Sequence, residues 1–196
     1  MNEPTSFLAG ATAQVATLLK EISEATDAYA AVSGIRCRSG CGQCCLKPGI
    51  EAMPLEMLPL ARALLSAGTA DQWYDLAAAD LDGVCVFYAR DPSDHTLGRC
   101  TQYANRPSLC RLFGFAAVNT KAPRPPALAA CHWHKKLQPE TITLAQAAID
   151  AGGDVPKFSE YSLRLNMMAP LPSLSQTLPI NRALIQAIEK LSLDVI

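Results

Sequence analysis

The chain has 196 residues, enough for one well-buried domain, and its content of 49% hydrophobic and 18% charged residues excludes a disordered chain. Its formal net charge of -1 offers no cationic surplus to neutralise phosphates, so we expect no nucleic-acid partner. No stretch approaches the roughly 18 unbroken apolar residues that cross a bilayer, so we expect no membrane span. We therefore predict a single domain over residues 1–196.

Residues 1–20 lack the pattern of a secretory signal, because Glu3 stands where a positive charge belongs and the apolar residues are spaced apart. We therefore expect a cytoplasmic protein, in which thiols stay reduced. Clustered cysteines in that compartment usually bind metal or carry out redox chemistry. Eight cysteines are also sparser than the roughly 8–10% of a disulfide-built scaffold, so we interpret them as metal ligands and not as disulfide partners.

The first predicted element is an amphipathic helix over residues 6–31. Thr5 or Ser6 could cap it, and Gly34 ends it. Its apolar residues recur at steps of three and four, which is typical of one buried helical face. These residues are Phe7, Leu8, Ala11, Val15, Leu18, Leu19, Ile22 and Tyr29.

Further helices follow along the chain. Pro54 opens one over residues 54–65, in which Pro59 could produce a kink or two short pieces. Asp71 caps another over 71–81, and residues 144–149 form a short helical piece. The last helix, 181–191, is capped by Asn181 and buries one face. That face consists of Ala183, Leu184, Ala187, Ile188 and Leu191.

Strand character is limited to residues 84–89 and 97–103, and the turn-forming sequence 91–94 between them predicts a short hairpin. Arg106-Pro107 then starts a short helical turn that carries Cys110. The fold class that we expect is mainly α: a small helical domain with a short β-hairpin and irregular cysteine-rich metal-binding loops. The metal-binding core covers about residues 37–134.

The cysteines carry the chemistry of this sequence. The first four lie within nine residues as C-x3-C-x2-C-C, and such spacings let sulfurs converge on one point when the chain between them forms tight turns. Gly40 and Gly42 give that stretch the freedom to turn. We predict that all eight cysteines are metal ligands: Cys37, Cys41, Cys44, Cys45, Cys85, Cys100, Cys110 and Cys131.

The vicinal pair Cys44-Cys45 indicates more than one centre, because adjacent side chains diverge in a strand and in a helix. Our hypothesis is that one centre uses Cys37, Cys41 and Cys44 with a distant fourth ligand. The second would use Cys45 with some of the remaining thiols, namely Cys85, Cys100, Cys110 and Cys131.

Cations and imidazoles accompany the cysteines. Four of the ten arginines are directly adjacent to a cysteine, and their charges would offset the negative charge of a thiolate site: Arg36, Arg38, Arg99 and Arg111. His132 and His134 follow Cys131 and could add a ligand, although exposed or capping roles are the simpler interpretation. His95 falls in the predicted turn, where we expect it to be exposed.

The elements Cys41-Gly42-x-Cys44-Cys45 and Cys100-x-x-Tyr103-x-x-Arg106-Pro107-x-x-Cys110-Arg111 together resemble the YkgJ-like cysteine-cluster family, CxxCxxCC. The resemblance covers about residues 37–113 and could extend to Cys131. It implies chelation of zinc or of an iron–sulfur cluster, without a settled biochemical role. A similar module occurs in flagellin lysine methylases, so the module can serve an enzyme. The first interval here is x3, where the family name has x2. The family pattern therefore supports Cys41, Cys44 and Cys45 as ligands more strongly than it supports Cys37.

Three functions compete. The first is a metal-binding module that acts as a structural, carrier or sensor protein, is not an enzyme on its own, and has an unidentified protein partner if any. The second is an iron–sulfur enzyme, since Cys37, Cys41 and Cys44 have the spacing of radical S-adenosylmethionine enzymes. However, the chain is short for their barrel and lacks repeating strand–helix alternation. The third is a redox or thiol enzyme using Cys44-Cys45, without the βαβ unit that a thioredoxin-like enzyme needs. A labile cluster used as an oxidant sensor is the variant of this hypothesis that stays open.

Overall fold

The computed structural model describes residues 7–94 and 97–194. Within these ranges the chain is mainly α-helical, as predicted. The helices are α1 (Phe7–Ser33), α2 (Pro54–Ser66), α3 (Ala70–Ala79), α4 (Ser108–Leu112), α5 (His132–Leu137), α6 (Pro139–Asp150), α7 (Phe158–Met168) and α8 (Ile180–Leu193). None of them, within the described residues, combines the length and the apolar character that a membrane crossing needs.

Strands are short and occur as antiparallel pairs. The hairpin of β2 (Tyr88–Arg90) and β3 (Gly98–Cys100) confirms the predicted one, although both strands are shorter than the sequence indicates. The other two pairs join distant segments or close a loop. They are β1 (Glu51–Ala52) with β6 (Leu178–Pro179), and β4 (Ala117–Val118) with β5 (Ala127–Leu128).

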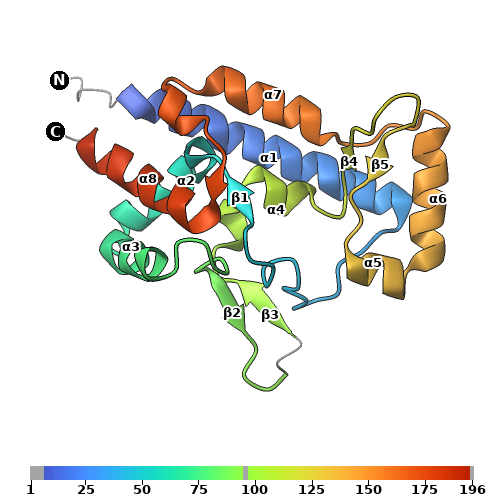
Figure 1. Cartoon of the computed structure of the whole chain (residues 1–196), viewed down its shortest axis with the longest axis horizontal. Helices are drawn as coiled ribbons and strands as arrows, with labels where there is room; N and C mark the ends of the chain where they lie inside the picture. The colour runs from blue at the N-terminus through green and yellow to red at the C-terminus, as the bar shows by residue number, and fades with distance from the viewer. Residues whose placement is uncertain (1–6, 95–96, 195–196) are drawn as a thin grey trace.

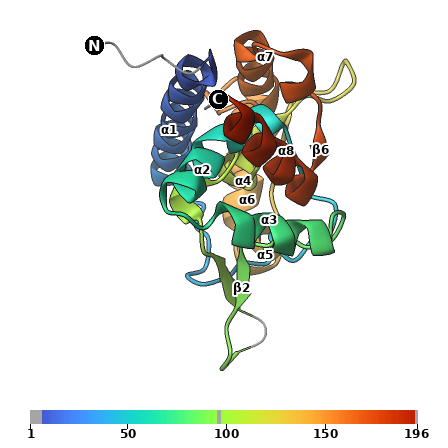
Figure 2. The same ribbon diagram turned by 90° about the vertical axis from the view of Figure 1, so that its left-hand side faces the viewer.

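The helices are arranged along α1, which runs the length of the molecule (Figure 1). Helices α2 and α7 pack beside it and α8 packs on α2, whereas α6 lies at its C-terminal end and α5 packs against α6. The hairpin β2–β3 projects away from the helices, as both views show (Figures 1 and 2). The segment between α1 and β1 therefore passes between the α5–α6 end and the base of the hairpin.

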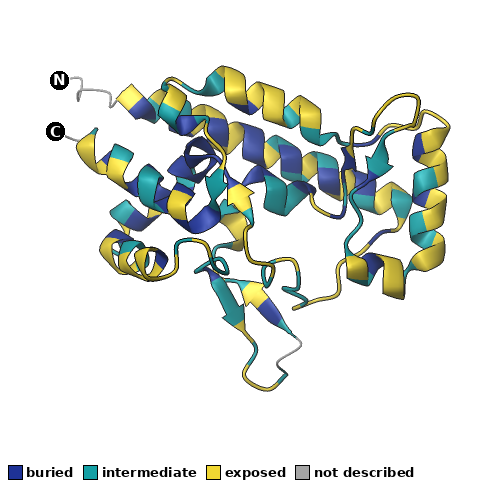
Figure 3. Ribbon diagram, in the orientation of Figure 1, coloured by how far each residue is buried: buried dark blue, intermediate teal, exposed yellow. Residues whose placement is uncertain are grey.

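The main core lies between α1, α2 and α8 (Figure 3). The buried face of α8 is the one that the sequence predicts, and α1 buries Val15, Leu18 and Ile22 completely or almost completely. Each such side chain contributes about 1.5–3 kcal/mol to stability by leaving water. Phe7 is an exception, because 64% of its surface is exposed. A second cluster packs Tyr29 and Ile35 against α6, β4 and β5.

Several predicted helix boundaries shift. Helix α1 ends at Ser33 and not at residue 31, and Gly34 follows with a φ of 74°, as a helix-ending glycine should. Thr5 and Ser6 lie outside the described residues. Pro59 lies within an unbroken α2, and Thr69 rather than Asp71 precedes α3.

The predicted cap of the last helix is wrong. Helix α8 begins at Ile180 after Pro179, and Asn181 lies inside it with 1% of its surface exposed. The buried amide instead bonds a distant loop. The sequence also gives no indication of α5 and α7, and α6 is twice the predicted length. Much of α7 is exposed, so its sequence lacks the wide apolar stripe by which an amphipathic helix is recognised.

Candidate metal centre

The segment between α1 and β1, residues 34–50, carries four of the eight cysteines and contains two tight turns; we call it the cysteine loop. The backbone N–H of Cys41 donates to the carbonyl of Arg38 (3.1 Å), and that of Cys45 donates to the carbonyl of Gly42 (2.9 Å). Gly42 has a φ of 54°, which glycine adopts without strain. The prediction of irregular backbone is therefore confirmed.

The cysteine loop lies directly on the β2–β3 hairpin. The N–H of Gly98 donates to the carbonyl of Gly40 (2.9 Å). A Cβ atom at Gly42 would lie 2.6 Å from the carbonyl group of Gly98 and 2.8 Å from the ring of Tyr88. Glycines on both sides thus allow backbone to approach backbone. This contact brings the loop near Cys100, which pairs with Tyr88 across the hairpin.

Five thiols meet where the loop, the hairpin and α4 come together, and we call them the five-thiol group. Burial, together with a smaller repulsion from neighbouring thiolates of the group, raises the pKa of Cys110 to about 12 and that of Cys85 to about 11. Cys85, Cys100 and Cys110 all pack against the main core, and the sulfurs of Cys44 and Cys45 lie 4.0 Å apart. The mutual repulsion agrees with one neighbourhood, because it acts over short distances. The members are Cys44, Cys45, Cys85, Cys100 and Cys110.

A buried carboxylate fixes the helix that carries Cys110. Glu56, on α2, has only 4% of its surface exposed. One of its oxygens accepts a hydrogen bond from the N–H of Met53 (3.2 Å), and the other accepts one from the N–H of Ser108 (2.7 Å). The first turns of α2 and α4 are therefore tied to the same side chain. Cys110 lies two residues after Ser108, so its position follows from this tie.

The loop that carries Cys85 is fixed by Asn181 on α8. The amide oxygen accepts from the N–H of Val86 (3.1 Å), and the amide nitrogen donates to the carbonyls of Asp80 (2.7 Å) and Val84 (3.1 Å). A fully buried amide with three partners holds a loop more firmly than a surface contact does, because breaking it leaves buried polar groups unsatisfied.

Cys37 and Cys131 lie at α5, and the charge of Cys41 acts on Cys37, so we call Cys37, Cys41 and Cys131 the three-thiol group. Cys131 is the N-cap of α5, and its sulfur accepts from the N–H of His134 (3.2 Å). The sulfur of Cys37 lies 3.4 Å from Nε2 of His134. Desolvation, and then repulsion from Cys131, Cys44 and Cys41, raises the pKa of Cys37 to about 11.

Gln138 ties the start of the cysteine loop to the α5–α6 junction. Its amide oxygen accepts from the N–H of Arg36 (3.1 Å), and its amide nitrogen donates to the carbonyl of the same residue (2.6 Å). The side-chain amide thus bonds both backbone groups of one residue, as a neighbouring strand does in a sheet. It places Cys37, the next residue, beside Cys131 and His134.

The vicinal sulfurs of Cys44 and Cys45 lie 4.0 Å apart, so they do not diverge as the sequence suggested. The expectation holds for helices and strands, whereas these residues lie in a turn. The hydrogen bond from Cys45 lowers the pKa of Cys44 to about 6, with a smaller contribution from the guanidinium of Arg106, while burial opposes the shift. The pKa of Cys45 is raised correspondingly.

The arginine that acts on the thiols is Arg106, which the sequence analysis did not select. It donates to the carbonyls of Tyr103 and Cys110 (both 3.1 Å), and its guanidinium lies 3.5 Å from the centre of the Tyr103 ring. It lowers the pKa of Cys44. Arg111 bonds instead to the carbonyl of Arg106 (2.7 Å) and to the hydroxyl of Ser23 on α1. Its role is to join α4 to α1.

The remaining arginines adjacent to cysteines, Arg36, Arg38 and Arg99, are exposed. His132 is exposed too, in agreement with its simpler interpretation, and His95 lies outside the described residues. The interpretation of His134 as an exposed or capping residue is wrong, because only 3% of its surface is exposed. Spacing could have indicated His134, because it lies three residues after Cys131 in the first turn of α5. Arg106 lies in an extended segment before α4, so helical spacing does not indicate it.

The donor set fits a soft metal ion or cluster, since it consists of thiols and a buried imidazole whose Nδ1 has no hydrogen-bond partner among the described residues. Within residues 7–94 and 97–194, no three His, Cys, Asp or Glu side chains are grouped closely enough to hold a metal ion. The structure thus gathers the cysteines into two neighbouring groups without placing their sulfurs around a common point.

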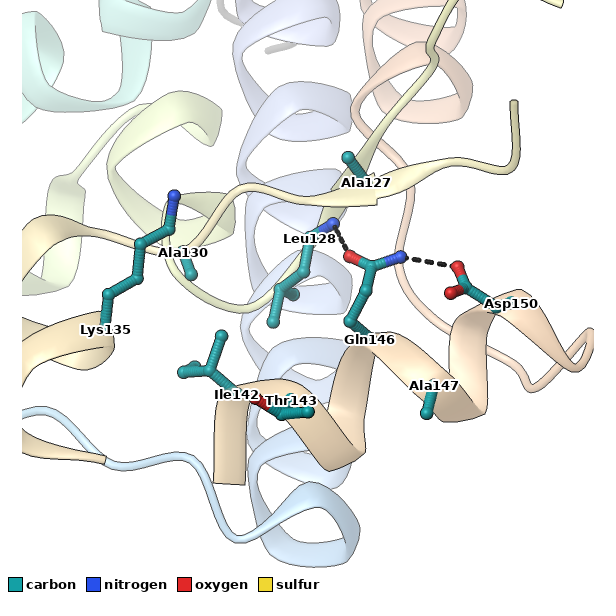
Figure 4. A pocket seen from close by; sticks show the side chains of 9 residues that line it. All are labelled: Ala127, Leu128, Ala130, Lys135, Ile142, Thr143, Gln146, Ala147 and Asp150. Carbon is teal, nitrogen blue, oxygen red and sulfur yellow. Dashed lines mark hydrogen bonds between the residues drawn. The ribbon is translucent and has the colours of Figure 1, made fainter. Parts of the chain in front are cut away.

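A pocket lies between α6 and the β5–α5 segment (Figure 4). Its apolar lining consists of Ala127, Leu128, Ala130, Ile142 and Ala147. Gln146 crosses it, accepting from the N–H of Leu128 (2.9 Å) and donating to Asp150 (2.7 Å). No cysteine lines the pocket, although Ala130 and Lys135, the neighbours of Cys131 and His134 in sequence, do.

Comparison with protein families matches residues 36–131 to CxxCxxCC, described as a "Putative zinc- or iron-chelating domain". Searches of curated proteins and of solved structures found no match. The matched segment begins next to Cys37 and ends at Cys131, so it contains every cysteine of the chain, while His134 and Asn181 lie beyond it. Residues 36–131 of this chain therefore match the CxxCxxCC domain.

Proposed function

We propose that the chain chelates zinc or an iron–sulfur cluster through its eight cysteines, and that it acts as a metal-binding protein rather than as an enzyme on its own. One observation carries this proposal: the cysteine loop packs Cys44 and Cys45 toward the hairpin that ends in Cys100, and Cys37 toward Cys131 and His134. Inert cysteines behave as small apolar residues and have no reason to assemble in this way.

The two groups support a division into two centres. The five-thiol group would hold one metal ion or cluster, and the three-thiol group the other. Cys44 lies between them, since its charge acts on Cys37 as well as on Cys110. Coordination would draw each set of sulfurs to a common point, so we expect metal binding to rigidify the cysteine loop.

The choice of metal depends on the donors. Four thiolates suit a structural zinc ion and an iron–sulfur cluster equally. The exclusively sulfur-based donors of the five-thiol group favour the cluster. Either one requires reduced thiols, which supports a cytoplasmic location.

A second candidate function is oxidant sensing by the vicinal pair. The 4.0 Å separation of the two sulfurs and the lowered pKa of Cys44 favour it, because a thiolate is the form that oxidants attack. It predicts that peroxide oxidises Cys44 first in the metal-free protein. Peptide mass spectrometry that finds oxidation spread evenly over the eight cysteines would exclude it.

The proposal is tested by counting metal in three proteins purified without oxygen: the wild type, Cys45→Ser and Cys131→Ser. We expect each variant to lose about half of the bound metal and to keep the rest, because each substitution removes a sulfur from one group only. Complete retention in both variants, with a metal-bearing wild type, would contradict the ligand assignment. Complete loss in both would contradict the division into two centres.

A further inference from the structure

His134 is enclosed by the protein in a way that a surface-capping histidine is not. Only 3% of its surface is exposed, and Phe115 packs edge-on against it with ring centres 5.6 Å apart. Gly114 covers another side: a Cβ atom there would lie 2.7 Å from Cε1 of the imidazole. The imidazole therefore fits against the backbone only because residue 114 is a glycine.

The enclosed ring has one satisfied nitrogen and one unsatisfied nitrogen. Nδ1 has no hydrogen-bond partner among the described residues, whereas Nε2 faces the sulfur of Cys37 at 3.4 Å. Leaving a buried polar atom unpaired costs about 1–3 kcal/mol. A purely structural role offers little to offset that cost, because an apolar side chain would fill the space without it. A strong bond at Nε2 would offset it.

The position of His134 on α5 places it on the same face of the helix as Cys131. Cys131 caps the helix and His134 lies three residues later, so the two form Cys-x-x-His over one helical turn. The N–H of His134 also donates to the sulfur of Cys131 (3.2 Å). Cys37 is held against the same turn by Gln138, which binds both backbone groups of Arg36.

We propose that His134 is a metal ligand that binds through Nε2 and completes the three-thiol group as a Cys3His site with Cys37, Cys41 and Cys131. This proposal rests on the metal binding proposed above and deepens it. Three thiolates and one imidazole are a common tetrahedral zinc set. The assignment also leaves the five-thiol group with only sulfur donors, so the two centres would differ in chemistry.

The test uses the full chain, reduced, freed of metal and reloaded with Zn(II), and measured by zinc-edge X-ray absorption. In the wild type we expect a nitrogen contribution at roughly 2.0–2.1 Å beside sulfur at roughly 2.3 Å. His134→Ala should lose the nitrogen contribution and weaken one zinc site by more than about tenfold. His132→Ala, an exposed neighbour on the same helix, should match the wild type.

Each outcome separates this inference from the proposal on which it rests. A wild type that binds zinc through sulfur alone overturns the role of His134 and leaves metal chelation intact, even if the alanine variant fails to fold. Unchanged zinc affinity in a folded His134→Ala protein overturns it as well. A wild type that takes up no zinc under reducing conditions overturns both. His134→Cys should restore one ligand and convert the nitrogen signal to sulfur.

Discussion

The side-chain amide of Asn181 accepts a hydrogen bond of 3.1 Å from the backbone N–H of Val86, across 95 residues of chain. Val86 follows Cys85 directly, whereas Asn181 lies on α8, beyond the CxxCxxCC domain. The same amide donates to the carbonyls of Asp80 and Val84. A helix outside the family segment therefore holds one of the candidate ligands in place.

Replacing Asn181 by alanine should destabilise the protein and release the Cys85 loop. Three backbone groups lose a buried partner, so we expect a loss of about 2–3 kcal/mol in the free energy of unfolding. Urea denaturation measures this loss, and alkylation of Cys85 in the metal-free protein should become faster. Asn166→Ala is the control, because Asn166 is exposed on α7 and should change stability by less than about 0.5 kcal/mol. Equal effects of the two substitutions would refute the anchoring role.

Glu56→Gln should weaken the tie between α2 and α4. Both carboxylate oxygens of Glu56 accept backbone hydrogen bonds, whereas an amide has one acceptor and would point its N–H2 group at the other donor. We expect a loss of about 1–3 kcal/mol in the free energy of unfolding. Glu24→Gln removes an exposed carboxylate 3.6 Å from Lys20 and should cost less than about 0.5 kcal/mol. Calorimetry that shows no difference between the two variants would contradict the assignment.

Gly42→Ala should separate the cysteine loop from the hairpin. Gly40→Ala is a close control, since Gly40 and Gly42 both have positive φ values, 64° and 54° respectively, and an added Cβ atom would clash with a neighbouring backbone only at Gly42. Left-handed backbone costs alanine about 1–2 kcal/mol at either position, and overpacking adds about 1–3 kcal/mol at Gly42 alone. We therefore expect Gly42→Ala to bind less metal than Gly40→Ala. Equal metal content would show that the loop does not need this contact.

Cys44 should be the first cysteine to react in the metal-free protein. Its pKa is lowered to about 6, so it is mostly thiolate at pH 7, and its reaction with iodoacetamide should slow as the pH falls below about 6. Cys110, with a pKa of about 12, should react slowly throughout this range. Arg106→Gln should move the midpoint of Cys44 upward, because it removes a nearby positive charge. A single midpoint near the ordinary thiol value for both cysteines, seen by mass spectrometry, would contradict this order.

Local patterns were sufficient for the elements that carry the core. The apolar spacing of residues 6–31 and 181–191 predicts α1 and the buried face of α8, and Gly34 indicates where α1 ends. The hairpin follows from its turn-forming residues, and the cysteine spacing with the Arg106-Pro107 element indicates the family. These signals depend on residues close together in the sequence, which is why they can be read without a structure.

Contacts between distant segments could not be predicted in this way. Asn181 looks like a cap because it precedes an apolar stripe, but its amide is used by a loop about 100 residues earlier. His134 looks like an exposed residue in a charged stretch, and only the fold shows that Gly114 and Phe115 enclose it. The same holds for Arg106, whose effect on Cys44 depends on how the cysteine loop packs.

The central claim, that the cysteines bind metal, is tested most directly by metal analysis and thiol titration of the full chain purified without oxygen. We predict zinc, or iron with acid-labile sulfide, at one equivalent or more per chain. We also predict that most thiols are protected until the metal is removed, and that an iron–sulfur protein is brown. A colourless protein without metal and with eight freely titrating thiols, which takes up neither zinc nor iron, would contradict the account.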